Sequence, residues 1–266
     1  MGILNVTPDS FADGGRHHDP GRAIDVGLRM VADGADLLDI GGESTRPGAA
    51  TVDADEELRR VLPVIDGLAR QTAVPLSIDT YKASVAQAAL DAGASIVNDI
   101  SGLRHDADLA GVVADRRAAI ILMHTRGRSQ DMYAQADYGD VVADVVRELA
   151  DSVASARQAG IDASAIAVDP GIGFAKRASQ SFEVLARLDN PAWAALDYPL
   201  LVGPSRKSFL QEALGARTPD DREWGTAAAV TAAVLAGAHI VRVHGVKEMV
   251  QVVRVADKIR WLREPS

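Results

Sequence analysis

Acidic and amide side chains follow short apolar runs at three places in the chain. Asp79 ends the run PLSID, Asn98 lies near the end of SIVND, and Asp169 ends AIAVD. Carboxylates that meet in a narrow space without a nearby cation repel one another and raise the free energy of the folded protein. A heterocycle with an amidine-like or guanidine-like edge would supply donors to both carboxylates and a mixed partner to the asparagine. A divalent metal such as magnesium is the competing explanation, although no histidine or further carboxylate completes a cage.

Cationic side chains follow two later apolar runs. The sequence RVH places Arg242 and His244 two residues apart, so a strand would present both on one face, where they can bind one anion. For Arg242 the alternative is a buried ion pair with a core carboxylate. The sequence GPSRKSF contains Lys207 and Ser208 at a place where barrels usually bind phosphate, and Lys207 could alternatively form a Schiff base, as in barrel aldolases.

Two connections are rich in turn residues and carry potential ligand groups. In GGESTRPGA the glycines allow close approach to a ligand, and Thr45 and Arg46 offer a hydroxyl and a guanidinium to phosphate or carboxylate. A solvated surface turn is the alternative. The connection over 5–21 is longer than the usual βα loop of about 2–6 residues, which indicates a binding loop containing Phe11. The adjacent His17 and His18 are interpreted as structural, because neighbouring loop histidines rarely face one ligand.

These side chains need a scaffold that brings distant segments together. Apolar runs rich in β-branched residues alternate with amphipathic helical segments along the whole chain, which is typical of βα units and a parallel sheet. The expected strands cover 2–5, 37–40, 75–79, 95–99, 118–124, 165–169, 199–203 and 239–244. Eight such units predict an α/β fold, a (β/α)₈ TIM barrel, formed by a single domain over 1–266.

The length supports the barrel. A (β/α)₈ barrel needs ~250 residues, which the 266-residue chain supplies once, and no linker divides it. An open doubly wound sheet is the alternative, but its G-x-G-x-x-G fingerprint is missing after the first strand. In a barrel, the polar residues at the strand ends meet at one rim, where active sites of this fold lie. They are Asn5, Asp39, Asp79, Asn98, Asp99, His124, Asp169, Ser205, Lys207, Arg242 and His244.

Composition excludes several kinds of partner. The net charge of −9 leaves no broad basic surface, so we expect a small-molecule ligand and no nucleic acid. The chain has no cysteine, which excludes disulfides and fits a cytoplasmic location. The longest apolar stretch, 227–243, contains Gly237 and Arg242, so it predicts a helix followed by a strand and no membrane span. No signal peptide is recognised at the start of the chain.

The motifs together resemble those of one family. GILNVTPDSF, GGESTRPG, SIDT, VNDISG, LMH, DPGIGF, SRKSF and RVH, in this order and spacing, are similar to those of the dihydropteroate synthase family. The resemblance covers nearly the whole chain. It implies a barrel that joins p-aminobenzoate to 6-hydroxymethyl-7,8-dihydropterin pyrophosphate, with Mg²⁺ assisting, and releases pyrophosphate without a protein nucleophile. It also implies a homodimer. The chain begins at the first barrel strand, whereas family members usually carry a short preceding segment.

The resemblance assigns roles to individual residues. The pterin edge would be held by Asp79, Asn98, Asp169 and Lys207, between apolar walls formed by Ile100, Met123 and Phe174. The diphosphate would be bound by Asn5, through magnesium, and by Arg46, Arg242 and His244. The p-aminobenzoate site would be formed by Phe11, Thr45, Pro47 and Ser208. The catalytic set would be Asp79, Lys207, Arg242 and His244. Sulfonamides would compete with p-aminobenzoate, and sensitivity is expected because no extra residue separates Thr45 from Gly48.

Three other functions remain open from the residues. A pterin-binding methyltransferase with a corrinoid partner would share the acidic residues but should lack the SRK strand end. A Schiff-base aldolase would react through Lys207. A non-catalytic pterin-binding protein would bind the heterocycle without releasing pyrophosphate.

Overall fold

All eight predicted strands are present in the computed structural model, which describes residues 1–7, 19–44, 48–49, 51–127 and 131–262. The strands are β1 (Gly2–Asn5), β2 (Leu38–Gly41), β3 (Leu76–Asp79), β4 (Ile96–Asp99), β5 (Ala119–Met123), β6 (Ile166–Asp169), β7 (Leu201–Val202) and β8 (Ile240–Val241). β1 to β6 form one parallel sheet in chain order, and β7 pairs with β8. Parallel bridges join Val168 to Leu200 and Gly2 to Val243. These bridges close the strands into a (β/α)₈ barrel, as predicted.

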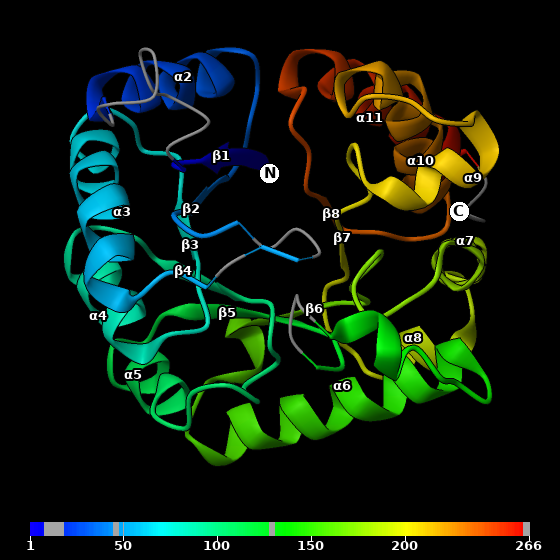
Figure 1. The fold of residues 1–266 in the computed structure, drawn as a ribbon, viewed down its shortest axis with the longest axis horizontal. Helices are drawn as coiled ribbons and strands as arrows, with labels where there is room; N and C mark the ends of the chain where they lie inside the picture. The colour runs from blue at the N-terminus through cyan, green and yellow to red at the C-terminus, as the bar shows by residue number, and fades with distance from the viewer. Residues whose placement is uncertain (8–18, 45–47, 50, 128–130, 263–266) are drawn as a thin grey trace.

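The helices surround the strands (Figure 1). They are α2 (Pro20–Ala32), α3 (Ala54–Ala69), α4 (Ala83–Asp91), α5 (Leu109–Asp115), α6 (Val141–Gln158), α7 (Ala178–Ala186), α8 (Pro191–Ala194), α9 (Gln211–Leu214), α10 (Glu223–Leu235) and α11 (Val246–Trp261). Short 3₁₀ turns, η1 (Met132–Gln135), η2 (Ala163–Ala165), η3 (Ser208–Leu210) and η4 (Asp220–Arg222), lie in the connections. The predicted helix and strand in 227–243 are α10 and β8.

No helix among the described residues is both long and apolar enough to cross a membrane.

Local sequence signals explain where these helices begin and what they bury. In α3 the Asp53 carboxylate accepts a hydrogen bond from the amide of Glu56 at 2.8 Å, and three acidic residues occupy the first turn. Both features favour the positive N-terminal end of a helix. The buried residues Val61, Val64, Ile65 and Leu68 then recur at helical spacing on the face toward the sheet. After α4, Gly93 adopts φ +116°, a conformation that favours glycine and ends the helix.

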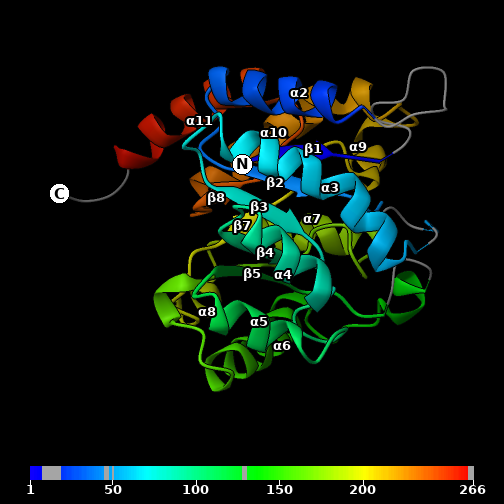
Figure 2. The same ribbon diagram turned by 90° about the vertical axis from the view of Figure 1, so that its left-hand side faces the viewer.

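Two apolar layers hold the barrel together. The main layer packs outward-facing strand residues such as Ile78 and Val97 against the helices. A smaller cluster contains Met1, Ile121 and Leu201, with half-buried residues from β4, β6 and β8 and none from a helix. Because successive strand residues point to opposite faces, this second cluster fills the interior of the barrel. Figure 2 shows the strands between the helices of the two sides.

Candidate active site

The strands direct their last inward-facing residues into the barrel above the interior apolar cluster. Asn98 lies two residues after Ile96, Asp169 two after Ala167, and Arg242 two after Ile240, and each earlier residue belongs to the interior cluster. Strand residues two apart share a face. The pairing register also aligns Asp79 with Asn98, and Met123 with Asp169. The barrel therefore brings together the acidic and amide residues that the sequence predicted to meet.

Arg242 is the cation of this group. Its Nε donates to Asp39 Oδ2 at 2.5 Å, and its Nη2 donates to Asp79 Oδ2 at 2.6 Å. Asn98 Nδ2 also donates to Asp39 Oδ2, at 2.9 Å. Arg242, just after β8, therefore supplies a nearby cation to Asp39 and Asp79, two of the strand-end carboxylates. The ion-pair alternative considered for Arg242 describes its contacts in this structure.

Burial leaves specific atoms without partners. Among the described residues, Asp39 Oδ1 and Asn98 Oδ1 are buried acceptors with no hydrogen-bond donor. Burial raises the pKa of Asp79 to about 7, although the Arg242 guanidinium acts in the opposite direction. Burial also raises the pKa of Asp169, against the opposing effect of Lys207. Buried unpaired acceptors are costly, so this interior is suited to a ligand that brings several N–H donors.

Lys207 approaches the same interior from the connection after β7. Its Nζ donates to the carbonyl oxygen of Ile172 at 2.6 Å and lies 4.6 Å from the centre of the Phe174 ring. Burial lowers the pKa of Lys207 to about 8. Lys207 and the half-buried Phe174 are therefore side by side.

A second polar pair ends β7 and β8. Ser205 Oγ and His244 Nδ1 are 3.0 Å apart, and the His244 amide donates to Ser205 Oγ at 3.2 Å. Next to Ser205, Arg206 adopts φ +58° and its Nε donates to Glu223 Oε2 at 2.7 Å. The adjacent Ser208 is exposed at the start of η3. His244 thus lies beside Ser205, while Arg242 points to Asp39 and Asp79.

The remaining predicted residues fall into two groups. Asn5 is half-buried at the end of β1, Ile100 is half-buried after β4, and Met123 is buried at the end of β5. Phe11, Thr45, Arg46 and Pro47 lie outside the described residues, as do His17 and His18.

Glu43, near the start of the GGESTRPGA connection, contacts residues of neighbouring elements. Glu43 accepts from the Tyr81 hydroxyl at 2.7 Å and forms an ion pair with Lys82. Lys82 Nζ also lies 2.5 Å from Glu57, which is buried in α3. These contacts link Glu43, just after β2, to the start of α4 and, through Lys82, to α3. The segment predicted to contact p-aminobenzoate follows Glu43 in the chain.

Sequence reasoning gave no role to two polar residues of this region. Asp39 was identified only as a strand end, although LLDI has the same apolar-then-acidic pattern as PLSID. Lys176, in DPGIGFAK, was not singled out, and it is 1% exposed. Its Nζ lies 2.9 Å from His124 Nδ1. The sequence around this lysine contains no pattern that would predict so deeply buried a side chain.

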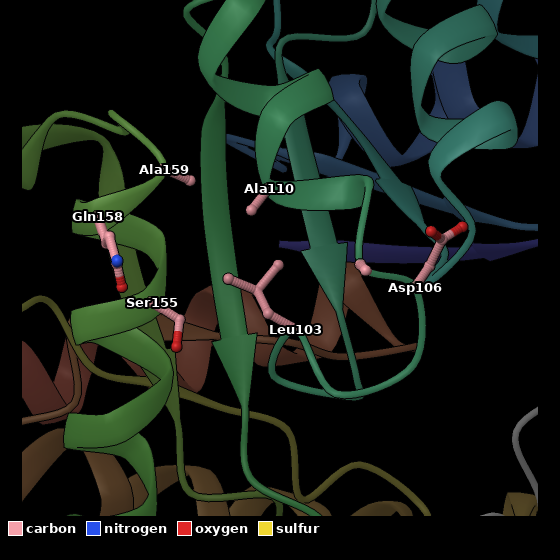
Figure 3. Close-up of a pocket in the computed structure, with 7 residues that line it drawn as sticks. Leu103, Asp106, Ala110, Ser155, Gln158 and Ala159 are labelled. Carbon is pink, nitrogen blue, oxygen red and sulfur yellow. The ribbon is translucent and has the colours of Figure 1, made fainter.

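Two surface hollows lie elsewhere. One of about 280 Å³ lies between α5 and α6 and is lined by Leu103, Asp106 and Ser155, among others (Figure 3). Its carboxylate is already occupied, because Asp106 accepts from the amides of Ala83 and Asp108. A second hollow, of about 710 Å³, is lined by Trp193, His239 and neighbouring residues. Neither contains a residue of the strand-end group.

Comparisons with known proteins identify the family and the fold of this chain. A family model described as pterin binding enzyme matches residues 1–244. A dihydropteroate synthase from Synechocystis sp. is 48% identical over 259 residues, covering 97% of this chain and 89% of the relative. The crystal structure of a Clostridium difficile dihydropteroate synthase in the presence of pteroic acid has a TM-score of 0.91 and 43% identity, covering 97% of this chain and 95% of that chain. The Yersinia pestis enzyme with a sulfonamide drug has a TM-score of 0.91 and 41% identity, covering 98% and 94%.

Proposed function

The chain belongs to the pterin-binding enzyme family, and within it to the dihydropteroate synthases of folate synthesis, so we propose that its transferase reaction joins p-aminobenzoate to 6-hydroxymethyl-7,8-dihydropterin pyrophosphate. The products are 7,8-dihydropteroate and pyrophosphate. Pteroic acid, present with the Clostridium difficile relative, is a pterin linked to p-aminobenzoate, which supports both substrate classes.

One observation carries the proposal: the barrel interior holds buried acceptors that lack donors. The 2-amino and ring N–H groups of a pterin supply donors to Asn98 Oδ1 and to the carboxylates of Asp79 and Asp169. Lys207 supplies a donor to the ring acceptors from beside Phe174. Ile100, Met123 and Phe174 would form the apolar walls.

The residues also support the bond-breaking step. Loss of pyrophosphate leaves positive charge on the pterin methylene and ring, which the ionised carboxylate of Asp79 stabilises. The amine of p-aminobenzoate then attacks the methylene carbon and loses a proton. No covalent bond to the protein is needed, so Lys207 acts as a hydrogen-bond donor and not as a Schiff base.

The leaving group would be bound at the ends of β1 and β8. Two donor atoms of Arg242 are already fixed by carboxylates, which holds its guanidinium in place and leaves Nη1 for the diphosphate. His244, held by Ser205, is the second binding group of this anion site. Arg46 is proposed as a third, from the segment outside the described residues.

Magnesium is proposed to be bound jointly by a side chain of this protein and by the phosphates of the substrate. The described residues contain no cluster of three or more His, Cys, Asp or Glu side chains that could hold a metal ion. Magnesium commonly keeps several waters and is held by one or two protein oxygens together with substrate phosphates. Asn5, with its side-chain oxygen at the end of β1, is the proposed protein ligand. When bound, the metal would neutralise charge on the departing diphosphate.

The p-aminobenzoate site is proposed to contain Ser208, Phe11, Thr45 and Pro47, of which only Ser208 is described. Sulfonamides share the shape of p-aminobenzoate, and a sulfonamide complex of the Yersinia pestis relative supports competition at this site. Calorimetry of sulfamethoxazole binding, with and without pyrophosphate and magnesium, tests ordered binding. Tighter binding in the presence of both is expected, and equal affinity would contradict it.

A pyrophosphate-release assay with the dihydropterin substrate tests the reaction. We expect release to require the pterin pyrophosphate and to be stimulated by p-aminobenzoate and magnesium, with dihydropteroate formed in equal amount. Tight pterin binding without release under any condition would favour the non-catalytic alternative. Trapping of a carbonyl substrate on Lys207 by borohydride would favour an aldolase, and methyl transfer to a corrinoid protein would favour the third alternative.

The proposal includes a homodimer and a cytoplasmic location. The absence of cysteine in the sequence fits a reducing compartment. Val255 and Ile259 of α11 and Leu262, which caps its end, are exposed at 63%, 41% and 77% and recur at helical spacing. An exposed apolar face of this kind is suited to a second copy of the chain.

A further inference from the structure

The connection between β6 and α7, residues 170–177, forms part of the proposed pterin site and has an unusual backbone. It contains Ile172, whose carbonyl accepts from Lys207, and the wall residue Phe174. Gly171, Gly173 and Ala175 have φ values of +67°, +80° and +47°, so the chain turns repeatedly through the left-handed region. Such a backbone makes few regular hydrogen bonds of its own and must be held from outside.

Side chains hold this connection at every carbonyl from residue 171 to residue 175. The acceptor and donor pairs are Gly171 with Lys176 at 3.1 Å, Ile172 with Lys207 at 2.6 Å, Gly173 with Tyr133 at 3.4 Å, Phe174 with Lys176 at 3.1 Å, and Ala175 with Tyr138 at 2.8 Å. Lys176 is the donor that holds two of them, one on each side of Ile172. The two lysines therefore hold adjoining peptide groups of the same turn.

Lys176 has its three donors in use. Besides the two carbonyl groups, its Nζ contacts His124 Nδ1 at 2.9 Å, and His124 Nε2 lies 3.1 Å from Glu148 Oε2. The lysine is 1% exposed and no ion pair with a carboxylate is found for it among the described residues. Burial lowers its pKa to about 7. A buried amino group is costly, and an apolar side chain of similar size would avoid that cost.

The connection is closely packed at Gly171. A side chain at Gly171 would bring its Cβ to 1.9 Å from the carbonyl oxygen of His124, so the turn lies directly against the end of β5. If Lys176 were lost, the buried Gly171 carbonyl would keep the amide of Phe174 as a donor, and the half-buried Phe174 carbonyl would lose its side-chain donor. The turn would then shift or open, and Phe174 is the side chain that would move with it.

We propose that Lys176 is a positioning residue for the heterocycle. It keeps Phe174 and the Ile172 carbonyl in place when Lys207 binds the ligand. The inference rests on the proposed function. In this structure Lys207 donates to Ile172, and the same donor is needed by a bound pterin. The carbonyl of Ile172 then shares Lys207 with the ligand, while Lys176 continues to hold the carbonyls of Gly171 and Phe174 on its two sides.

The test compares two ligands on Lys176→Met, which keeps the length of the side chain and removes its donors. By calorimetry we expect the Kd for 6-hydroxymethylpterin to rise about tenfold or more, and the Kd for inorganic pyrophosphate with magnesium to change by less than about twofold. Tyr138→Phe removes one donor from the far end of the same turn and is expected to raise the pterin Kd by less than about threefold. Lys176→Gln, which keeps one donor, should recover part of the lost pterin affinity.

The outcomes separate this inference from the proposed function. Wild-type protein that binds no pterin would contradict the function. Wild-type protein that binds pterin, with a folded Lys176→Met variant that binds it equally well, would overturn only the role of Lys176. An equal loss of pterin and pyrophosphate affinity would also overturn it, because a general structural defect does not distinguish the ligands. If Lys176→Met fails to fold, the same two-ligand comparison on Lys176→Gln decides between these outcomes.

Discussion

The Asp79 carboxylate is shielded from solvent and is also proposed to bind the ligand. Its Oδ2 accepts from Arg242 at 2.6 Å, and burial raises its pKa to about 7. Lys207, which is assigned to the same proposed pterin site, has its pKa lowered by burial to about 8. The proposed reaction needs the carboxylate ionised and the lysine protonated. These two conditions coexist only in a narrow pH range.

We therefore expect kcat/KM for the pterin pyrophosphate to rise as the pH increases through about 7 and Asp79 loses its proton. It should fall above about pH 8, as Lys207 loses its own. Asp79→Asn should remove the rise at acidic pH and reduce kcat/KM about 10- to 100-fold. Asp91→Asn, at a carboxylate paired with Arg116 on the surface, is the matched control and should keep the wild-type profile. If the rise in kcat/KM at acidic pH persists in Asp79→Asn, the titrating group is not Asp79.

At the scale of elements, the connection after β7 is held by α10, whose first residue also lies beside the start of α11. Arg206 takes up the left-handed conformation at φ +58°, and its amide donates to Thr226 Oγ1 at 3.0 Å. Its guanidinium is bound by Glu223, the first residue of α10. A Cβ at Gly245 would lie 2.2 Å from Glu223 Oε1, so this carboxylate also lies against the start of α11. One glutamate thus joins the connections that carry Lys207 and His244.

Glu223→Gln is expected to lower the free energy of unfolding by about 1–2 kcal/mol, since it removes a charged acceptor from Arg206. Because Arg206 precedes Lys207, we also expect a higher KM for the pterin pyrophosphate. Chemical denaturation and steady-state kinetics measure the two effects. Glu183→Gln, in a more exposed pair with Arg187, is the control and should change stability by less than about 1 kcal/mol. Equal effects of both substitutions would remove the special role of Glu223.

At the scale of the whole molecule, apolar side chains of α11 are exposed in the part of the chain that the structure describes. Val255 and Ile259 of α11 and Leu262, which follows it, are exposed, and Ala256 of the same helix is 1% exposed against the core. The helix therefore has apolar residues on a solvent-exposed side and on a side that packs against the core. The proposed homodimer would cover the exposed side.

If α11 is the dimer interface, Ile259→Glu should convert the protein to a monomer by placing a charge in an apolar contact. Sedimentation over a range of concentrations would show the mass of one chain for this variant and of two for the wild type. Arg254→Gln makes the same change in net charge on another side of α11 and should stay dimeric. A monomeric wild-type protein, or a dimer that withstands Ile259→Glu, would contradict this interface.

The sequence by itself determined the eight strands, their parallel order and the barrel. The spacing of apolar residues and the choice of turn residues are local features that can be recognised within a few neighbouring positions. It also placed Asp79, Asn98 and Asp169 at strand ends, and strands in one barrel must bring such ends together. The short helices α8 and α9 were not predicted. A single turn of helix depends on its surroundings more than on its own few residues.

Only the tertiary structure decided which partner each polar group takes. The ion pairs of Arg242 with Asp39 and Asp79 span 203 and 163 residues, and no local pattern encodes such a choice. The burial of Lys176 against His124 likewise depends on how the turn after β6 lies on the end of β5. The charge of each residue is a property of the sequence. Its pKa and its free hydrogen-bonding atoms depend on solvent exclusion by distant segments, which exists only in the folded chain.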